Sequence, residues 1–349
     1  MFMATGAECT RTKRTLRSGR AEGRHSRRRR LLCRHAQRRP RHDRLALEAA
    51  VLRAAAAGER RGARRHRRGG AVAGVAGLTV ADLPPLSYVR PRSLAEAAAA
   101  IARPGACIYA GGTELLVALA ERRPWTRSVR EIVDVKSLTA ARSIRRSGDH
   151  LRIGALTTTA ELAASPLVRR WAPALAEAAA ATAAPALRRR ATIGGNVATP
   201  AGDVTTALLA LDATVDVLHG GRTRTEPLAA FMAAQASAWP RQRLIVAMRL
   251  GRNPRSAFEK EGLRSGFSRA LASVAVARDG DRVTVALGGL RDRPFVATTV
   301  AAAVVGGGDA HAALATDCRP PDDGIVSPAY RLRLAERLLA RALGRVMPR

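Results

Sequence analysis

The sequence predicts an α+β fold beyond residue 79, and three observations support this prediction. Short apolar runs of strand length alternate with longer, Ala-rich stretches of helical character. Hydrophobic residues make up 47% of the 349 residues, which is enough to fill the cores of two or three domains. Two widely separated glycine-paired turns each follow an extended run and lead into a helix-like stretch.

The individual elements can be assigned in chain order. Residues 93–103 are expected to form a helix that begins at Ser93, with Glu96 as the second half of a capping box. Further strands are expected at 108–109, 132–135, 151–153 and 214–218, and further helices at 115–121, 172–182 and 204–211. A linker at 251–254 precedes the last expected elements, which are a hairpin of 273–277 and 283–287 around Asp279-Gly280-Asp281 and two helices at 298–305 and 330–343.

The two glycine-paired turns are the most informative local feature. They read Ala110-Gly111-Gly112-Thr113-Glu114-Leu115 and Thr192-Ile193-Gly194-Gly195-Asn196. Glycine lets the backbone approach a ligand closely, and consecutive free N–H groups, helped by the positive end of a following helix, suit an anion. Thr192 and Asn196 can hydrogen-bond phosphate oxygens or tie down their loop. Two such turns suggest a ligand with two adjacent phosphates.

The residues alone leave two interpretations open, which are phosphate binding and a pair of structural turns. The chain has neither a G-x-G-x-x-G segment nor a Gly-Lys-Ser/Thr segment. Most glycine pairs are ordinary turns. We expect turns of that kind at the other glycine clusters, which are Gly220-Gly221, Gly288-Gly289 and Gly306-Gly307-Gly308.

From about residue 83 onward, the chain resembles the FAD-binding subunit of the molybdenum hydroxylases, a family that includes the medium subunits of carbon monoxide dehydrogenase and xanthine dehydrogenase. The two glycine turns match the family's A-G-G-T-D/E-L and T-I-G-G-N segments. The other landmarks that match in order are residues 88–97, 153–158, 286–289 and 330–343, with Pro185 and Arg188. The loop between Asn196 and Asp203 is slightly shorter than in the family, but Pro200-Ala201-Gly202 still places Asp203.

The resemblance implies a two-lobed, PCMH-type FAD-binding domain with the cofactor between its lobes, followed by a smaller α+β domain like the C-terminal domain of the carbon monoxide dehydrogenase flavoprotein. The first domain would span residues 80–251, with lobes at about 80–137 and 138–251, and the second residues 256–347. The cofactor-binding residues that the resemblance implies are Ile108, Tyr109, Ala110, Gly111, Gly112, Thr113, Glu114, Leu115, Thr192, Ile193, Gly194, Gly195, Asn196, Asp203 and Lys260.

The resemblance also implies roles for individual side chains. Asp203 would accept a hydrogen bond from the flavin or its sugar chain, and Lys260 would place positive charge near the reduced ring; the alternative for Lys260 is a solvated surface lysine. The run Arg188-Arg189-Arg190 could face phosphate, but we expect it to line a subunit surface or solvent. Valine in place of Gly194 or Gly195 is expected to abolish flavin binding and to leave most of the fold intact.

No paired acid and base in the sequence indicates a substrate-oxidising site, and a flavin carries its own electron chemistry. By the resemblance, FAD is bound non-covalently, the molybdenum cofactor lies on a molybdopterin-binding large subunit and 2Fe–2S clusters lie on a small subunit. Electrons would pass from these clusters through FAD to NAD or another acceptor. Two alternatives are a self-contained FAD-dependent oxidase or dehydrogenase and a basic nucleic-acid-binding protein.

Positive charge is concentrated near the N-terminus. The net charge of the chain is +32, and residues 1–80 contain 22 Lys/Arg against 5 Asp/Glu. Their arginine runs and poor periodicity predict that residues 1–79 are disordered, with only 45–57 able to form a helix. They could be a nucleic-acid-binding arm, a twin-arginine-like targeting peptide around Arg67-Arg68, or a non-native extension translated from a start placed too far upstream. We favour the extension and expect residues 1–79 to be dispensable for flavin binding and assembly.

The cysteines and histidines do not form a recognisable metal site. The four cysteines Cys9, Cys33, Cys107 and Cys318 are scattered without a C-x-x-C segment, and the 7 histidines are isolated. Cys107 is expected to pack as a small hydrophobic residue rather than act as a nucleophile. The apolar run after Arg68 is too short to span a bilayer. We therefore expect a reducing, cytoplasmic setting with no metal on this chain.

Overall fold

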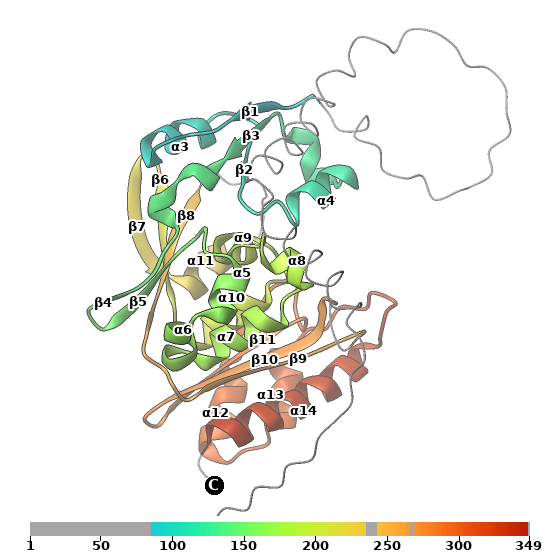
Figure 1. Ribbon diagram of the computed structural model, residues 1–349. Helices are drawn as coiled ribbons and strands as arrows, with labels where there is room; N and C mark the ends of the chain where they lie inside the picture. The colour runs from blue at the N-terminus through green and yellow to red at the C-terminus, as the bar shows by residue number, and fades with distance from the viewer. Residues whose placement is uncertain (1–84, 235–242, 265–267, 348–349) are drawn as a thin grey trace, which may run out of the picture. The chain divides into compact units, whose positions relative to one another are not determined.

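The computed structural model of the protein describes residues 85–234, 243–264 and 268–347 (Figure 1). The expectations for residues 1–79, including a helix at 45–57, lie outside the described residues. Helices and strands both contribute extensively along the described ranges, which confirms the α+β class.

A three-stranded parallel sheet comes first along the chain. In spatial order its strands are Ser87–Val89 (β1), Glu131–Asp134 (β3) and Ala106–Tyr109 (β2). Helix α3 (Leu94–Ile101) connects β1 to β2, and helix α4 (Leu115–Ala120) follows β2. Parallel sheets bind ligands beyond the carboxyl ends of their strands. Strand β2 ends at this edge and runs directly into the first glycine turn, residues 110–114.

A five-stranded antiparallel sheet follows. Its strands in spatial order are Ile144–Ser147 (β4), His150–Gly154 (β5), Leu244–Gly251 (β8), Thr214–His219 (β6) and Arg222–Pro227 (β7). A run of helices connects β5 to β6, namely Thr159–Ala164 (α5), Pro166–Trp171 (α6), Pro173–Ala181 (α7), Pro185–Arg188 (α8), Ile193–Ala198 (α9) and Asp203–Ala210 (α10). Helix α11 (Leu228–Ala234) follows β7.

A four-stranded antiparallel sheet with its own helices completes the described chain. Its strands in spatial order are Phe295–Val296 (β12), Arg282–Gly288 (β11), Ala270–Asp279 (β10) and Ser256–Gly262 (β9). The helices that follow are Thr298–Gly306 (α12), Ala310–Asp317 (α13) and Pro328–Val346 (α14). The period-2 alternation of β10 divides this sheet between two cores: Ala275 faces the cluster that includes α7 and α10, and Val274 faces the cluster that includes α14.

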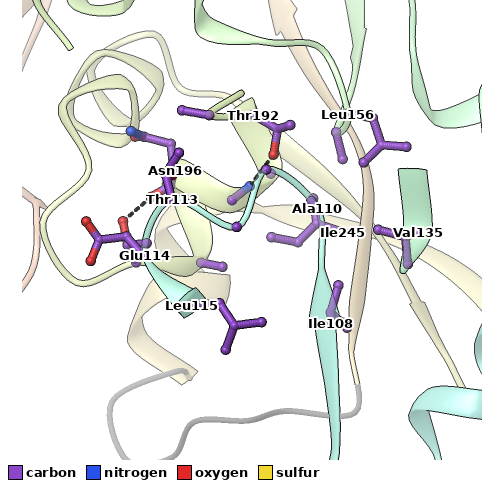
Figure 2. Close-up of a pocket in the computed structure, with 18 of the residues that line it drawn as sticks. Ile108, Ala110, Thr113, Glu114, Leu115, Val135, Leu156, Thr192, Asn196 and Ile245 are labelled. Atoms are coloured by element: carbon purple, nitrogen blue, oxygen red, sulfur yellow. Dashed lines mark hydrogen bonds between the residues drawn. The ribbon is translucent and has the colours of Figure 1, made fainter. Parts of the chain in front are cut away.

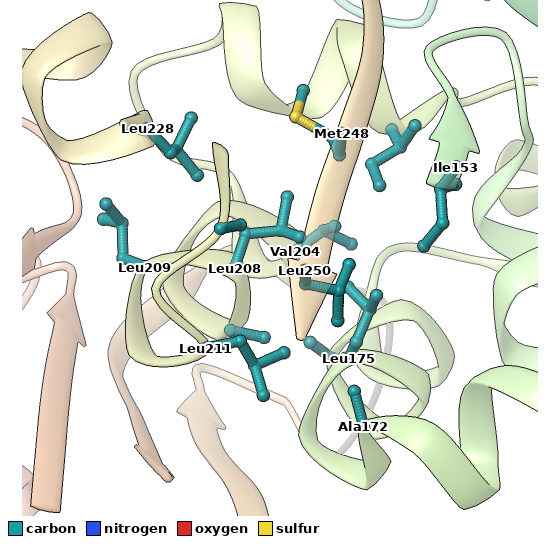
Figure 3. Packing of buried hydrophobic residues seen from close by; sticks show 14 of the residues in the cluster. Ile153, Ala172, Leu175, Val204, Leu208, Leu209, Leu211, Leu228, Met248 and Leu250 are labelled. Carbon is teal, nitrogen blue, oxygen red and sulfur yellow. The ribbon is translucent and has the colours of Figure 1, made fainter. Parts of the chain in front are cut away.

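Helices α7 and α10 pack between the second and third sheets. Figure 3 shows Leu175 of α7 and Leu208 of α10 packed against Met248 and Leu250 of β8. Every residue of α10 is buried, so this helix is fixed on all sides. Asp203 is the first residue of α10 and is held in the same fixed position.

Most of the expected elements are confirmed within one or two residues, and the hairpin turns at Gly280 where φ is +57°. The capping box at Ser93 is only half formed. The Ser93 hydroxyl accepts from the Glu96 N–H at 3.1 Å, but the Glu96 carboxylate accepts from the Arg92 N–H. A complete box caps α5 instead, between Thr158 and Glu161.

The minor glycine clusters and the described cysteines have structural roles. Gly220, Gly221, Gly289 and Gly307 have positive φ in turns, as expected of ordinary turns. Cys107, a residue of β2, is buried in a hydrophobic cluster with Leu115 and Leu119, which confirms its packing role. None of the helices within the described ranges combines the length and apolarity that a bilayer span requires.

Candidate cofactor-binding cavity

A cavity of about 350 Å³ lies where the first glycine turn meets α9, within the size range of ordinary ligand pockets (Figure 2). Segments far apart in the sequence line it, and Val135, Leu156 and Ile245 supply an apolar wall. The sequence-predicted residues that line it are Ile108, Ala110, Gly111, Gly112, Thr113, Glu114, Leu115, Thr192, Gly194, Gly195, Asn196 and Asp203. Tyr109, Ile193 and Lys260 are not among its lining residues.

The first glycine turn presents backbone donors. The N–H groups of Gly111, Gly112 and Thr113 meet no acceptor within the part of the chain that the structure describes. Gly112 has φ of +73°, a conformation that favours glycine. Unpaired backbone N–H groups in such a turn form a concavity that binds anions. This turn therefore has the donors that a phosphate group requires.

Two side chains outside the cavity hold the first turn in place. The Arg190 guanidinium donates to the Gly111 carbonyl oxygen at 3.3 Å and to the Tyr109 hydroxyl at 3.1 Å. The Lys136 ammonium lies 4.2 Å from the centre of the Tyr109 ring. Arg190 thus braces the turn across a long sequence separation while remaining exposed, in agreement with the surface position expected for it. Arg188 of the same run is half-buried and donates to the carbonyl oxygens of Thr182 and Ala183.

The second glycine motif differs from its prediction. It is the first turn of helix α9 rather than a turn before a helix. Its N–H groups are already bonded: Ile193 donates to the Thr157 carbonyl, Gly194 to the Ala155 carbonyl and Gly195 to the Thr192 hydroxyl, at 2.9, 2.9 and 3.1 Å. The expectation of free N–H groups here is wrong, because docking of α9 on the segment after β5 engages two of them and the Thr192 cap engages the third.

Glycine is still required in α9 for steric reasons. A Cβ on Gly194 would lie 2.8 Å from the Ala155 methyl group, which real structures do not tolerate without movement. A Cβ on Gly195 would meet only the Thr192 hydroxyl, at 3.0 Å. Gly194 thus allows α9 to pack on the protein itself, and Gly195 leaves a side-chain-free surface on the cavity. Valine at Gly194 would therefore disturb the fold, contrary to the sequence-based expectation.

Thr192 and Asn196 tie down the second motif. The Thr192 hydroxyl caps α9 through Gly195, as noted above. The Asn196 side-chain oxygen accepts from the Thr205 N–H at 3.2 Å and so connects α9 to the first turn of α10. Of the two roles that the sequence left open for these side chains, the structure shows the structural one.

Asp203 and Lys260 form a buried ion pair. The Lys260 ammonium lies 2.6 Å from an Asp203 carboxylate oxygen and also donates to the Ala181 carbonyl at 3.1 Å. Both side chains are only 10% exposed, so Lys260 is not a solvated surface lysine. Burial raises the pKa of Asp203, and the adjacent Lys260 ammonium opposes that shift. Asp203 lines the cavity, and Lys260 supports it from behind.

Three arginines that the sequence did not single out also line the cavity. Arg243 pairs with Glu226, and Arg269 lies 2.9 Å from Glu114 of the first turn. Arg293 makes no ion pair with a described carboxylate, and its Nη1 atom is buried without a hydrogen-bond partner among the described residues. These arginines stand in loops or beside strand ends in a chain that has many arginines, so no sequence signal distinguished them.

The donors and shape of the cavity suit an extended anionic ligand with a planar apolar part. The guanidinium of Arg293 and the first-turn N–H groups that meet no acceptor among the described residues can bind phosphate oxygens. The glycine surfaces and the aliphatic wall leave room for a flat ring. The residues present therefore fit a dinucleotide cofactor.

Known proteins resemble this chain over the same region. Residues 84–252 match the model of a family described as the FAD binding domain in molybdopterin dehydrogenase. The 6-hydroxypseudooxynicotine dehydrogenase complex subunit alpha of Paenarthrobacter nicotinovorans is 33% identical over 298 residues, which cover 76% of this chain and 97% of that protein. The putative xanthine dehydrogenase FAD-binding subunit of Escherichia coli K12 is 36% identical over 149 residues, but the match covers 42% of this chain and only 50% of that protein.

A solved structure agrees with these matches. In a carbon monoxide dehydrogenase from Hydrogenophaga pseudoflava, which lacks the Mo-pyranopterin moiety of its cofactor, one chain superimposes with a TM-score of 0.69 and 27% sequence identity. The superposition covers 76% of this chain and 98% of that one.

Proposed function

Because this chain belongs to the FAD-binding subunits of the molybdenum hydroxylase family, we propose that it is the flavin-bearing electron-transfer subunit of such an enzyme complex. The observation that carries the proposal is the first glycine turn, which lies in the region that matches the family, lines the cavity and has N–H groups that meet no acceptor among the described residues. The bound FAD would supply the redox chemistry, and the protein would bind and orient it.

Each group of residues has a defined task in this proposal. Gly111, Gly112 and Thr113 bind the diphosphate through the backbone, and Arg190 holds their turn in position. Gly195 leaves the space that the cofactor occupies. The Asp203 carboxylate, kept in place by Lys260, accepts a hydrogen bond from the flavin or its ribityl chain.

The proposed partners are a molybdopterin-binding large subunit and an iron–sulfur small subunit. Several relatives are named as the medium chain or one subunit of a multi-subunit dehydrogenase, which supports this arrangement. In the proposed complex, electrons arrive from the iron–sulfur subunit and leave from FAD to NAD or another acceptor. The cavity and the family match favour this role over a nucleic-acid-binding protein.

Purification of the complex tests the proposal against a self-contained flavin enzyme. The untagged protein should copurify with molybdenum and iron, and both metals should separate from the flavin when the subunits are dissociated. Metal analysis and flavin absorbance of the same fractions provide the measurement. A metal-free flavoprotein that reduces an acceptor at the expense of a substrate would contradict the subunit role.

A further inference from the structure

Arg293 is distinguished from the other basic groups at the cavity by its missing partner. Arg243, Arg269 and Lys260 each pair with a described carboxylate. Arg293 has no such partner in the described ranges, and its Nη1 atom is shielded from solvent. A buried donor without an acceptor is costly, and the cost is greater for a charged group. Arg293 also lines the cavity, so rotation of its guanidinium toward an anionic ligand there would supply an acceptor and remove this cost.

The fold brings Arg293 toward the first glycine turn. Arg293 lies two residues before β12, whose Phe295 pairs with Leu287 at the end of β11, so it lies near Gly288 and Gly289. A Cβ on Gly289 would lie 2.7 Å from the Leu271 carbonyl oxygen, so this loop adjoins the start of β10. Arg269, which just precedes β10, binds Glu114 of the first turn. The loop of Arg293 and the first turn therefore meet at the same cavity.

We propose that Arg293 donates hydrogen bonds to the diphosphate of the FAD; this inference rests on the proposed function. The diphosphate carries the permanent negative charge of the cofactor, and neutral backbone N–H groups of the first turn cannot cancel that charge. A guanidinium matches phosphate oxygens in geometry and forms short, charge-assisted bonds. The third sheet thus contributes a cation to a site whose backbone donors come from the first sheet.

Binding of FAD and of two of its parts tests which portion of the cofactor Arg293 contacts. Flavin-free full-length protein is titrated with FAD, with ADP, which has the diphosphate without the flavin, and with riboflavin, which has the flavin without phosphate. Arg293→Met should raise the Kd for FAD and for ADP about 10- to 100-fold, because a charge-assisted hydrogen bond is lost. The Kd for riboflavin should stay within about twofold of the wild-type value. Arg293→Lys should lose less affinity for FAD and ADP than Arg293→Met does, because lysine keeps a positive charge at this position.

Arg170→Met is the matched control, since Arg170 is an exposed arginine on α6 that does not line the cavity. It should leave all three Kd values unchanged. Unchanged FAD binding by Arg293→Met, or an equal loss for FAD and riboflavin, would overturn the assignment while the proposed function stands. If Arg293→Met does not fold, the ratio of the Kd for FAD to the Kd for riboflavin is measured on Arg293→Lys and tests the assignment instead. A wild-type protein that binds FAD no more tightly than riboflavin would contradict the proposed function as well.

Discussion

Gly111→Ala is expected to remove most of the flavin from the purified protein. A Cβ at this position would overlap the backbone carbonyl of Arg190, which cannot rotate away as a side chain could. The added methyl group would separate the first glycine turn from the segment that leads into α9. Overpacking of this kind costs about 1–3 kcal/mol, which corresponds to a loss of roughly 10- to 100-fold in flavin affinity if the turn opens to relieve it. Flavin absorbance per chain provides the measurement.

Two other glycines serve as comparisons. Gly148→Ala introduces the same methyl group at a hairpin turn with φ of +59° and nothing within 4 Å, so it should keep its flavin despite local strain. Gly195→Val should lose flavin with little loss of stability, since a Cβ there meets only the Thr192 hydroxyl. Flavin content in Gly111→Ala equal to that of the wild type would show that the first turn does not bind the cofactor.

Lys260→Met is expected to destabilise the protein strongly at neutral pH. The substitution leaves the Asp203 carboxylate buried without its cation, and breaking a buried ion pair from one side costs about 3–5 kcal/mol. The double variant Lys260→Met/Asp203→Asn removes both charges and should recover most of the lost stability. Denaturant unfolding of the flavin-free proteins measures the difference without a contribution from cofactor binding.

The loss caused by Lys260→Met should depend on pH in a defined direction. Burial raises the pKa of Asp203, and removal of the Lys260 ammonium eliminates the main group that opposes this shift. A carboxyl group whose pKa is raised in the folded state binds its proton more tightly in the folded protein than in the unfolded chain. Protonation of this group therefore stabilises the folded state at low pH. This stabilisation is lost as the pH rises through the folded-state pKa. The difference in the free energy of unfolding between Lys260→Met and the wild type should therefore become smaller as the pH falls. A gap that is constant with pH would show that Asp203 is not the source of the instability.

Local patterns predicted the elements well because each depends on neighbouring residues. The turn at Gly280, the strand alternation of β10 and the helix expected at 330–343 follow from turn chemistry and side-chain periodicity within a few residues. The half-formed capping box at Ser93 shows the limit of such patterns. Glu96 could reach either the Ser93 or the Arg92 N–H, and the local sequence does not distinguish them.

The candidate site was harder to predict because its decisive contacts join distant segments. The N–H groups of Ile193 and Gly194 are consumed by the carbonyls of Thr157 and Ala155, which belong to a segment that only the tertiary fold brings near. The same holds for the contact of Arg190 with Gly111 and for the ion pair between Asp203 and Lys260. The sequence assigned both members of that pair to the flavin site, but it did not indicate that they bind each other.

Identification of the released flavin tests most directly whether the cavity holds a dinucleotide without a covalent bond. Full-length protein is purified with its bound cofactor and heated, and the supernatant and the precipitate are analysed separately by chromatography. The cavity has backbone donors and an arginine that pairs with none of the described carboxylates, so the supernatant should contain FAD and the precipitated protein should be colourless. Release of FMN, or flavin that remains with the denatured protein, would contradict the proposed binding mode.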